Sequence, residues 1–279
     1  MPTQLLPTPE RLRAVLSDPE EPVELLCLLR TDGDPRAALR ERLGELGGAV
    51  TWVARNELLA IGDGELHWTH TVLARIERGN RLIAAAEAGG VEVDAAELQM
   101  HVYRPRRPPA VVLRLLRLLR PIGRLFEGGE DGLAEFTMGL EEGGIHPRRD
   151  QIARIAASTR DTPAYMINLL HYRERAEYRL PVRRPNVSGR RAYERYGLVA
   201  LRSVYMLGGE VVHIGQLGAP LVEGTHTAAA GRWDDLAIVR YPSVSRLLKL
   251  TRMPGYPHSM RHREAGLDRT ALIVSELLG

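Results

Sequence analysis

Cysteine and long apolar runs are both scarce in this chain of 279 residues, and each scarcity excludes a class of protein. The single cysteine, Cys27, lies within an apolar run, so no disulfide can form within the chain and we expect a buried, unreactive thiol. No uncharged apolar run is long enough to cross a membrane, and the amino terminus has no basic segment followed by an apolar one. These absences predict a soluble, cytoplasmic protein without stable membrane insertion.

Lysine is almost absent as well, because Lys249 is the only lysine among the 38 basic residues. The formal net charge is only +3, and neither an aromatic-interleaved basic strand nor a known nucleic-acid motif accompanies the arginines. We therefore expect no nucleic-acid partner. The chain also has no glycine-rich phosphate loop after a strand, no paired cysteines for zinc and no nucleophile elbow, so the short catalytic signatures identify no reaction.

The chain does contain an internal repeat. The residues that lead into 22–30 resemble those that lead into 163–171, and the two Leu-Gly-Gly sequences that begin at Leu46 and Leu207 follow at matching places. Trp68 and Trp233 then recur with similar flanking residues. Self-similarity of this length indicates a duplicated unit, whose two copies can dock once as a homodimer of a single-copy ancestor would.

Apolar periodicity and turn residues predict the same order of elements in both copies: helix, strand, helix, strand, strand, helix, strand. Without the leading helix this is the β-α-β-β-α-β order of a ferredoxin-like unit, whose antiparallel sheet carries both helices on one face. We therefore predict an α+β fold of two tandem ferredoxin-like domains, packed sheet to sheet as an intramolecular, pseudo-dimeric α+β barrel. The predicted divisions are a degenerate domain at 1–105, a linker at 106–144 and a second domain at 145–279.

The same patterns predict where the individual elements begin and end. Ser188 is expected to cap a long helix that stops at Gly208 and Gly209. The strands are expected at 23–29, 49–55, 66–76 and 98–104 in the first copy, and at 165–172, 210–216, 233–241 and 270–277 in the second.

The linker contains a basic amphipathic helix at 110–126, followed by a polar, glycine-rich stretch at 128–144 that is expected to be flexible. The arginines of the helix recur every three or four residues, as Arg114, Arg117, Arg120 and Arg124. Such a helix can lie on an anionic membrane surface, cap a ligand pocket, or lay its apolar side across two docked domains. We expect the last arrangement, because a soluble protein rarely exposes so wide an apolar surface. The leucines expected to be buried are Leu115, Leu116, Leu118 and Leu119.

Polar residues that could form a site gather in the second copy. Those expected to act as general acids or bases, or to hold a developing oxyanion, are His171, Tyr193, Arg240 and His262. Those expected to contact a ligand are Asn168, Arg173, Tyr196, His213, Tyr256, His258 and Arg263. In the first copy Cys27 aligns with Asn168 and Arg30 with His171, so changes at His171 or Arg240 should weaken ligand binding, whereas changes at Arg30 or Arg75 should not.

Backbone geometry limits how these residues can combine. Successive strand residues point to opposite faces, so Asn168 is separated from His171 and Arg173, and only one of these sets can face the helices where a pocket would form. His258 and His262 are four residues apart, a spacing that suits either a metal or a solvated pair beside arginines. Because no third ligand is identifiable, we predict no metal. Arg240, within an apolar strand, should have a carboxylate partner or an anionic ligand.

Several short motifs of the second copy occur together in one order. They are Asn168-Leu-Leu-His-Tyr-Arg173, Ser188-Gly-Arg with Tyr193 and Tyr196, Gly208-Gly209, Trp233-Asp with Tyr241-Pro-Ser243, and His262-Arg263 with Gly266-Leu-Asp-Arg-Thr270. With these motifs, the stretch 147–277 resembles domain-of-unknown-function family 1330, and the first copy resembles a degenerate relative. The resemblance implies a dimeric α+β barrel, here closed within one chain. It implies no reaction, because the family has no settled activity.

Three functions are compatible with these residues. The first is an enzyme that binds a small, largely apolar metabolite between the sheet and helices of the second domain, and isomerises, cyclises or oxidises it without a cofactor by general acid or base chemistry. The second is a non-catalytic module for small-molecule binding or for interaction. The third is haem binding, which needs one axial histidine. Apart from haem, no cofactor is expected, and a homo-oligomer is compatible with each function.

Overall fold

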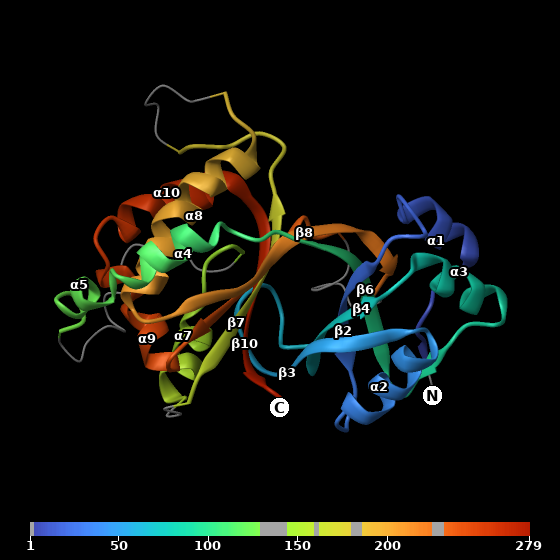
Figure 1. Ribbon diagram of the computed structural model, residues 1–279. Coiled ribbons are helices and arrows are strands. Elements are labelled where there is room, and N and C mark those ends of the chain that lie inside the picture. The colour runs from blue at the N-terminus through green and yellow to red at the C-terminus, as the bar shows by residue number, and fades with distance from the viewer. Residues whose placement is uncertain (1–2, 129–143, 159–161, 180–185, 225–231) are drawn as a thin grey trace.

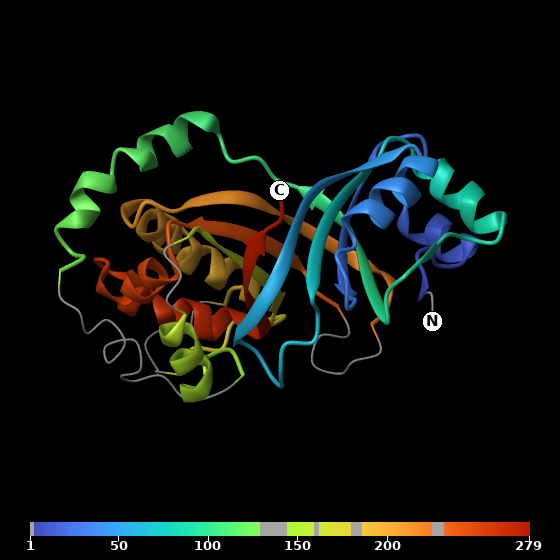
Figure 2. The same ribbon diagram turned by 90° about the horizontal axis from the view of Figure 1, so that it is seen from below.

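Eight antiparallel strands form one closed barrel in the computed structural model, which describes residues 3–128, 144–158, 162–179, 186–224 and 232–279 (Figures 1 and 2). The strand order around the barrel is β10-β3-β4-β2-β6-β8-β9-β7. The first half contributes β2 (Val23–Arg30), β3 (Gly48–Ile61), β4 (His70–Ile76) and β6 (Glu97–Pro105). The second half contributes β7 (Ala164–Tyr172), β8 (Glu210–Val222), β9 (Asp235–Tyr241) and β10 (Leu267–Leu277). Two short strands, β1 (Thr3–Gln4) and β5 (Glu92–Val93), form a separate small sheet.

Helices cover the outside of the barrel (Figure 1). Those of the first half are α1 (Pro9–Val15), α2 (Arg36–Glu45) and α3 (Gly79–Glu87). Between the halves lie α4 (Ala110–Arg117) and α5 (Arg120–Arg124). Those of the second half are α7 (Arg149–Ala157), α8 (Gly189–Met206), α9 (Val244–Leu248), the 3-10 helix η1 (Lys249–Arg252) and α10 (Tyr256–Gly266). Ser188 caps α8 as predicted, because its hydroxyl accepts a hydrogen bond from the Arg191 backbone N–H at 3.2 Å.

The predicted fold of two tandem ferredoxin-like domains, packed sheet to sheet, is wrong. The edge strands of the two halves pair with each other: β6 with β8, where Tyr103 lies opposite Leu217, and β10 with β3, where Leu272 lies opposite Ile61. These two seams continue the hydrogen-bond ladders around the molecule, so there is one closed sheet and not two stacked ones. Closure has a physical reason, since a sheet edge that stays open leaves a row of unpaired backbone groups.

Strand alternation divides the apolar residues between the inside and the outside of the barrel. The interior is filled by side chains from both halves, among them Trp52, Trp68 and Trp233. On the outer face of the first half, a second apolar core lies beneath the helices, and it includes Leu25 and Cys27. Burial raises the pKa of the Cys27 thiol to about 12, so Cys27 is the buried thiol that its apolar surroundings predicted.

The helical segment between the halves is less buried than predicted. Leu116 and Leu119 pack against the core of the second half. Leu115 and Leu118, however, are 61% and 69% exposed, so the prediction that they are buried is wrong. The predicted flexible stretch lies mostly in 129–143, outside the described residues. Over the described parts of the chain, no helix is both long and apolar enough to span a membrane.

Candidate functional site

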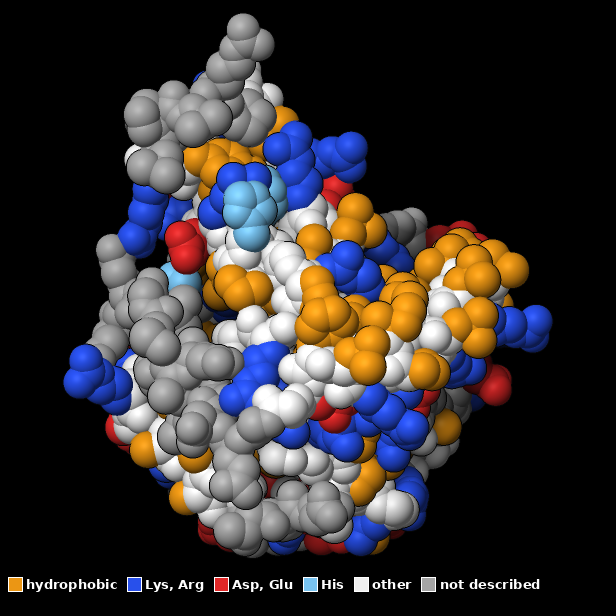
Figure 3. All heavy atoms as spheres, turned by 90° about the vertical axis from the view of Figure 1, so that its left-hand side faces the viewer, with side chains coloured by type: hydrophobic (Ala, Val, Ile, Leu, Met, Phe, Trp, Pro, Cys, Tyr) orange, Lys and Arg blue, Asp and Glu red, His pale blue; other side chains and the backbone are white. Residues whose placement is uncertain are grey.

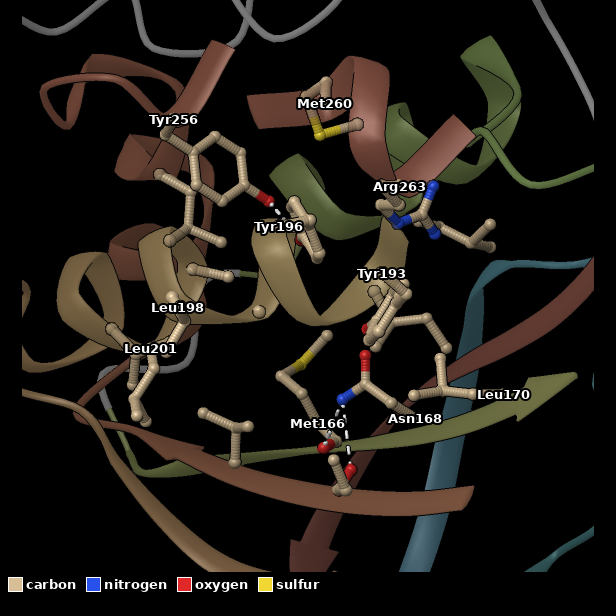
Figure 4. A pocket seen from close by; sticks show the side chains of 18 of the residues that line it. Met166, Asn168, Leu170, Tyr193, Tyr196, Leu198, Leu201, Tyr256, Met260 and Arg263 are labelled. Carbon is tan, nitrogen blue, oxygen red and sulfur yellow. Dashed lines mark hydrogen bonds between the residues drawn. The ribbon is translucent and has the colours of Figure 1, made fainter. Parts of the chain in front are cut away.

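A cavity of about 1330 Å³ lies between the outer face of the second-half strands and the helices α8 and α10 (Figure 4). Its floor is mostly apolar and includes Met166, Asn168, Leu170, Ala237 and Val239. Its roof carries the polar groups and includes Tyr193, Tyr196, Tyr256, Met260 and Arg263. This volume exceeds the range of about 300–1,000 Å³ that is common for ligand pockets, so the space suits a ligand of considerable size.

The alternation of β7 determines which predicted residues reach the cavity. Met166, Asn168 and Leu170 face it, whereas Ile167 and Leu169 belong to the barrel interior. His171 is on the same side as the interior residues and does not line the cavity. Its Nδ1 lies 2.9 Å from a carboxylate oxygen of Asp234.

Asn168 places a hydrogen-bond acceptor on the cavity floor. Its side-chain nitrogen donates to the backbone carbonyls of Met166 and Ala237, each at 3.1 Å. This fixes the amide orientation, because a flipped amide would bring its oxygen against two carbonyl oxygens. The Asn168 oxygen therefore points up toward Tyr193 (Figure 4).

Four tyrosines form a chain of aromatic contacts along the cavity. The ring centroids of Tyr172 and Tyr193 are 5.4 Å apart, those of Tyr193 and Tyr196 are 5.2 Å apart, and those of Tyr196 and Tyr256 are 5.8 Å apart. The hydroxyls of Tyr196 and Tyr256 lie 3.0 Å from each other. Burial raises the pKa of both Tyr193 and Tyr256 above the usual range of tyrosine, so these hydroxyls stay protonated at neutral pH and can donate hydrogen bonds.

Arg263 is a buried cation at the roof of the cavity, with only 6% of its surface exposed. Its guanidinium donates to the backbone carbonyl of Ile145. Within the part of the chain that the structure describes, no carboxylate forms an ion pair with it, and the neighbouring Glu264 lies 3.6 Å from His146 instead. A buried charge without a counter-ion is costly, so Arg263 leaves a place for a negative group of a ligand.

One polar network at the cavity was not anticipated from the sequence. Asp235 accepts hydrogen bonds from Arg190 at 2.8 and 2.6 Å and from the Tyr172 hydroxyl at 2.8 Å. The Arg190 guanidinium also lies over the Tyr172 ring, 4.7 Å from its centroid. The Trp-Asp motif marks this neighbourhood in the sequence, but the partners come from β7, α8 and β9, which no local pattern connects. Because Asp235 is neutralised by Arg190, it does not oppose an anion at Arg263.

The structure brings together six of the eleven residues predicted for the site. They are Asn168, Tyr193, Tyr196, Tyr256, His258 and Arg263, and of these His258 is exposed. The other five have partners elsewhere: His171 with Asp234, Arg173 with Glu177, His213 in edge contact with Trp52, Arg240 with Glu210, and His262 with the Tyr178 hydroxyl. Arg240 thus has the carboxylate partner that its strand requires, at 3.6 Å.

The described side chains were predicted to hold no metal, and haem was the one cofactor considered for them. No group of three His, Cys, Asp or Glu residues that could hold a metal ion occurs among the described residues. A haem group would need an axial ligand that points into the cavity. His171 and His262 are engaged outside the cavity, and His258, which lines it, is exposed, so these three residues offer no buried axial ligand and do not fit haem.

Comparison with known proteins gives similarity without an activity. No family model and no curated protein matches the chain, so the resemblance to family 1330 stays a prediction. Among solved structures, a methylated form of RPA0582 is 31% identical and covers 50% of this chain and 98% of that one, with a TM-score of 0.43. A second structure of RPA0582, described as a protein of unknown function from Rhodopseudomonas palustris, is 32% identical over 48% of this chain and 95% of that one, with a TM-score of 0.40. A mutant chlorite dismutase from Candidatus Nitrospira defluvii is 11% identical over 96% of this chain and 94% of that one, with a TM-score of 0.36.

Proposed function

We propose that the cavity binds a largely apolar small molecule that carries a carboxylate or carbonyl oxygen. The observation that supports this most directly is Arg263, a buried guanidinium without an acidic partner among the described residues, at the roof of an apolar space. A ligand oxygen with negative charge would supply the missing counter-ion, and the alkyl or aryl body of the ligand would cover the apolar floor.

The polar groups of the cavity divide the work of recognition and chemistry. In the proposal, Arg263 and the protonated hydroxyl of Tyr193 donate to the ligand oxygen, and the Asn168 oxygen accepts from a donor on the ligand. When a proton leaves the carbon beside a carbonyl, negative charge develops on the carbonyl oxygen, which these two donors would stabilise. This arrangement suits isomerisation or cyclisation by way of an enolate. In the proposal a water molecule takes the carbon proton, Arg263 and Tyr193 donate hydrogen bonds to the enolate oxygen, and the same water returns the proton to carbon.

Binding can be tested with a matched pair of probes, octanoate and octanol, by titration calorimetry. Octanoate should bind more tightly than octanol, and Arg263→Gln should weaken octanoate binding by roughly 10- to 100-fold, the usual worth of a hydrogen bond to a charged group, while leaving octanol unchanged. Arg240→Gln is the matched control, because Arg240 belongs to the same half but pairs with Glu210 outside the cavity. Equal affinity of the two probes, or equal losses in both variants, would refute the proposal.

Catalysis needs a separate measurement, because His171 and His262 lie outside the cavity and this favours a binding module without turnover as the second candidate. Deuterium exchange into the carbon beside the carbonyl of 2-octanone, followed by NMR in D₂O, reports enolate formation. An enzyme of the proposed kind should accelerate the exchange, and Tyr193→Phe should slow the exchange at saturating ketone by more than it weakens binding, because the lost donor matters most when charge has developed on the oxygen. Binding without exchange supports the module.

A further inference from the structure

The segment α4–α5 presents an unbroken apolar stripe to solvent. Its members are spaced four, three, four and three residues apart, which keeps them on one side of the helices. They are Val111, Leu115, Leu118, Ile122 and Leu125, and they are 64%, 61%, 69%, 48% and 80% exposed. Single exposed apolar residues are ordinary on a protein surface, but a contiguous row of five large ones marks an interaction site.

The opposite side of this segment fixes the direction in which the stripe faces. Leu113, Leu116 and Leu119 pack against the core of the second half. Gly123 lies so close to the end of α8 that a Cβ there would be 2.0 Å from the Met206 carbonyl oxygen. Arg120 also donates to that carbonyl at 2.8 Å. The segment therefore holds its apolar stripe outward because its other side is already docked.

Positive charge surrounds the stripe. Arg114, Arg117 and Arg124 are exposed on α4 and α5, and the basic side chains of Arg246, Lys249 and Arg252 reach the end of the segment at Glu127 and Gly128. Glu127 accepts ion pairs from both Arg120 and Arg246, and Glu210 pairs with Arg117. On the face of the molecule that carries α5, hydrophobic side chains gather beside Lys and Arg side chains (Figure 3).

We propose that α4–α5 docks this protein on the surface of an anionic lipid bilayer. Val111, Leu115, Leu118, Ile122 and Leu125 enter the boundary between head groups and acyl chains, and the flanking arginines meet the negative head groups. The charges favour this occupant over a second copy of the chain, because a two-fold contact through this face would bring arginines against arginines. The attachment is interfacial, in keeping with the absence of any spanning helix among the described residues.

Vesicle co-sedimentation tests the proposal with the full chain. Binding to phosphatidylcholine vesicles that contain about one-third phosphatidylglycerol should be strong at low salt, and binding to pure phosphatidylcholine weak. The pair Leu115→Asp and Leu118→Asp, and separately the pair Arg114→Glu and Arg124→Glu, should each reduce binding about tenfold or more. Leu277→Asp and Arg40→Glu are matched controls on other exposed positions and should bind like the parent chain.

A direct probe of depth comes from Leu118→Cys carrying an environment-sensitive fluorophore, since Cys27 is buried and stays unlabelled. Its emission should shift to the blue on addition of the anionic vesicles and not on addition of the neutral ones. Equal binding of both vesicle types, equal losses in the control variants, or an unshifted emission would overturn the proposal. So would sedimentation of the parent chain as a dimer that the Leu115→Asp and Leu118→Asp variant converts to a monomer, because the stripe would then cover a second copy. Each variant is first shown to have the same melting temperature as the parent chain, so that a loss of binding does not come from unfolding.

Discussion

His101, on β6, shows how a buried polar residue is held in one protonation state. Its Nδ1 lies 3.1 Å from the carbonyl oxygen of Gly218, and its Nε2 lies 2.8 Å from the side-chain nitrogen of Gln99. The carbonyl can only accept and the amide nitrogen can only donate, so the neutral ring with its proton on Nδ1 satisfies both contacts. Burial lowers the pKa of His101 to about 4, in agreement with this neutral form.

This lowered pKa predicts a dependence of stability on pH. Between pH 6.5 and pH 4 the unfolded chain binds a proton at His101 that the folded chain does not, so the free energy of unfolding should fall as the pH falls, by about 3 kcal/mol at most. In urea unfolding from pH 7.5 to pH 4, His101→Leu should be less stable at pH 7.5 but should lose less stability on acidification. His70, His213 and His262 are present in both chains, so their contributions cancel. Parallel pH profiles would contradict the prediction.

At this scale the sequence was informative where a polar residue interrupts an apolar pattern. Asn168 is such a residue on its strand, and Tyr193 was predicted among the polar residues of the following helix; both line the cavity. Asp235, Arg190 and Tyr172 were not predicted, because their network joins three elements whose spatial order the pattern does not contain. Arg240 and His171 also interrupt apolar strands, but they have carboxylate partners in Glu210 and Asp234, and no local pattern distinguishes such a structural pair from a site.

At the scale of elements, most of the predicted boundaries agree with the structure, and the two largest strand extensions have one cause. The strands predicted at 49–55 and 210–216 continue to Ile61 and Val222. The added residues form the seams: β3 pairs with β10 from Ala54 to Ile61, and β8 pairs with β6 from Gly215 to Val222. Periodicity indicates which face of a strand is buried but not which edge finds a partner, so the sequence could not show that these strands close a barrel.

The docking of α5 on α8 depends on a glycine. A Cβ at position 123 would stand 2.0 Å from the Met206 carbonyl oxygen, so Gly123→Val should force α5 away from α8 and cost about 1–3 kcal/mol of stability. Cleavage by trypsin after Arg124 should become faster, because a detached helix exposes its backbone, whereas Arg120 is not a trypsin site since Pro121 follows it. Gly128→Val is the control, since no atom lies within 4 Å of its added Cβ. Unchanged cleavage in Gly123→Val would show that the contact does not hold the helix.

At the scale of the whole molecule, the two halves contribute four strands each in the same relative order but use their outer faces differently. In the first half, Cys27 and Leu25 belong to a filled apolar core beneath the helices. In the second half, the face that carries Asn168 borders the cavity. The duplication, with polar residues concentrated in the second copy, was predicted from aligned residues. The single barrel was not, because it arises from pairing between copies and not within either one.

The shared barrel predicts that neither half folds by itself. Residues 1–143 and 144–279, expressed separately, would each expose two strand edges, at β3 and β6 or at β8 and β10, together with their share of the barrel interior. Each fragment should therefore elute as an aggregate in size-exclusion chromatography and lack a cooperative thermal transition. Co-expressed fragments should assemble into a complex of the mass of the intact chain, because the seams and the interior need no peptide bond between residues 143 and 144.

The control is a co-expressed pair in which Leu272→Pro removes a backbone donor from the middle of β10, and that pair should not assemble. A fragment that unfolds cooperatively on its own would mean that the halves are independent domains after all.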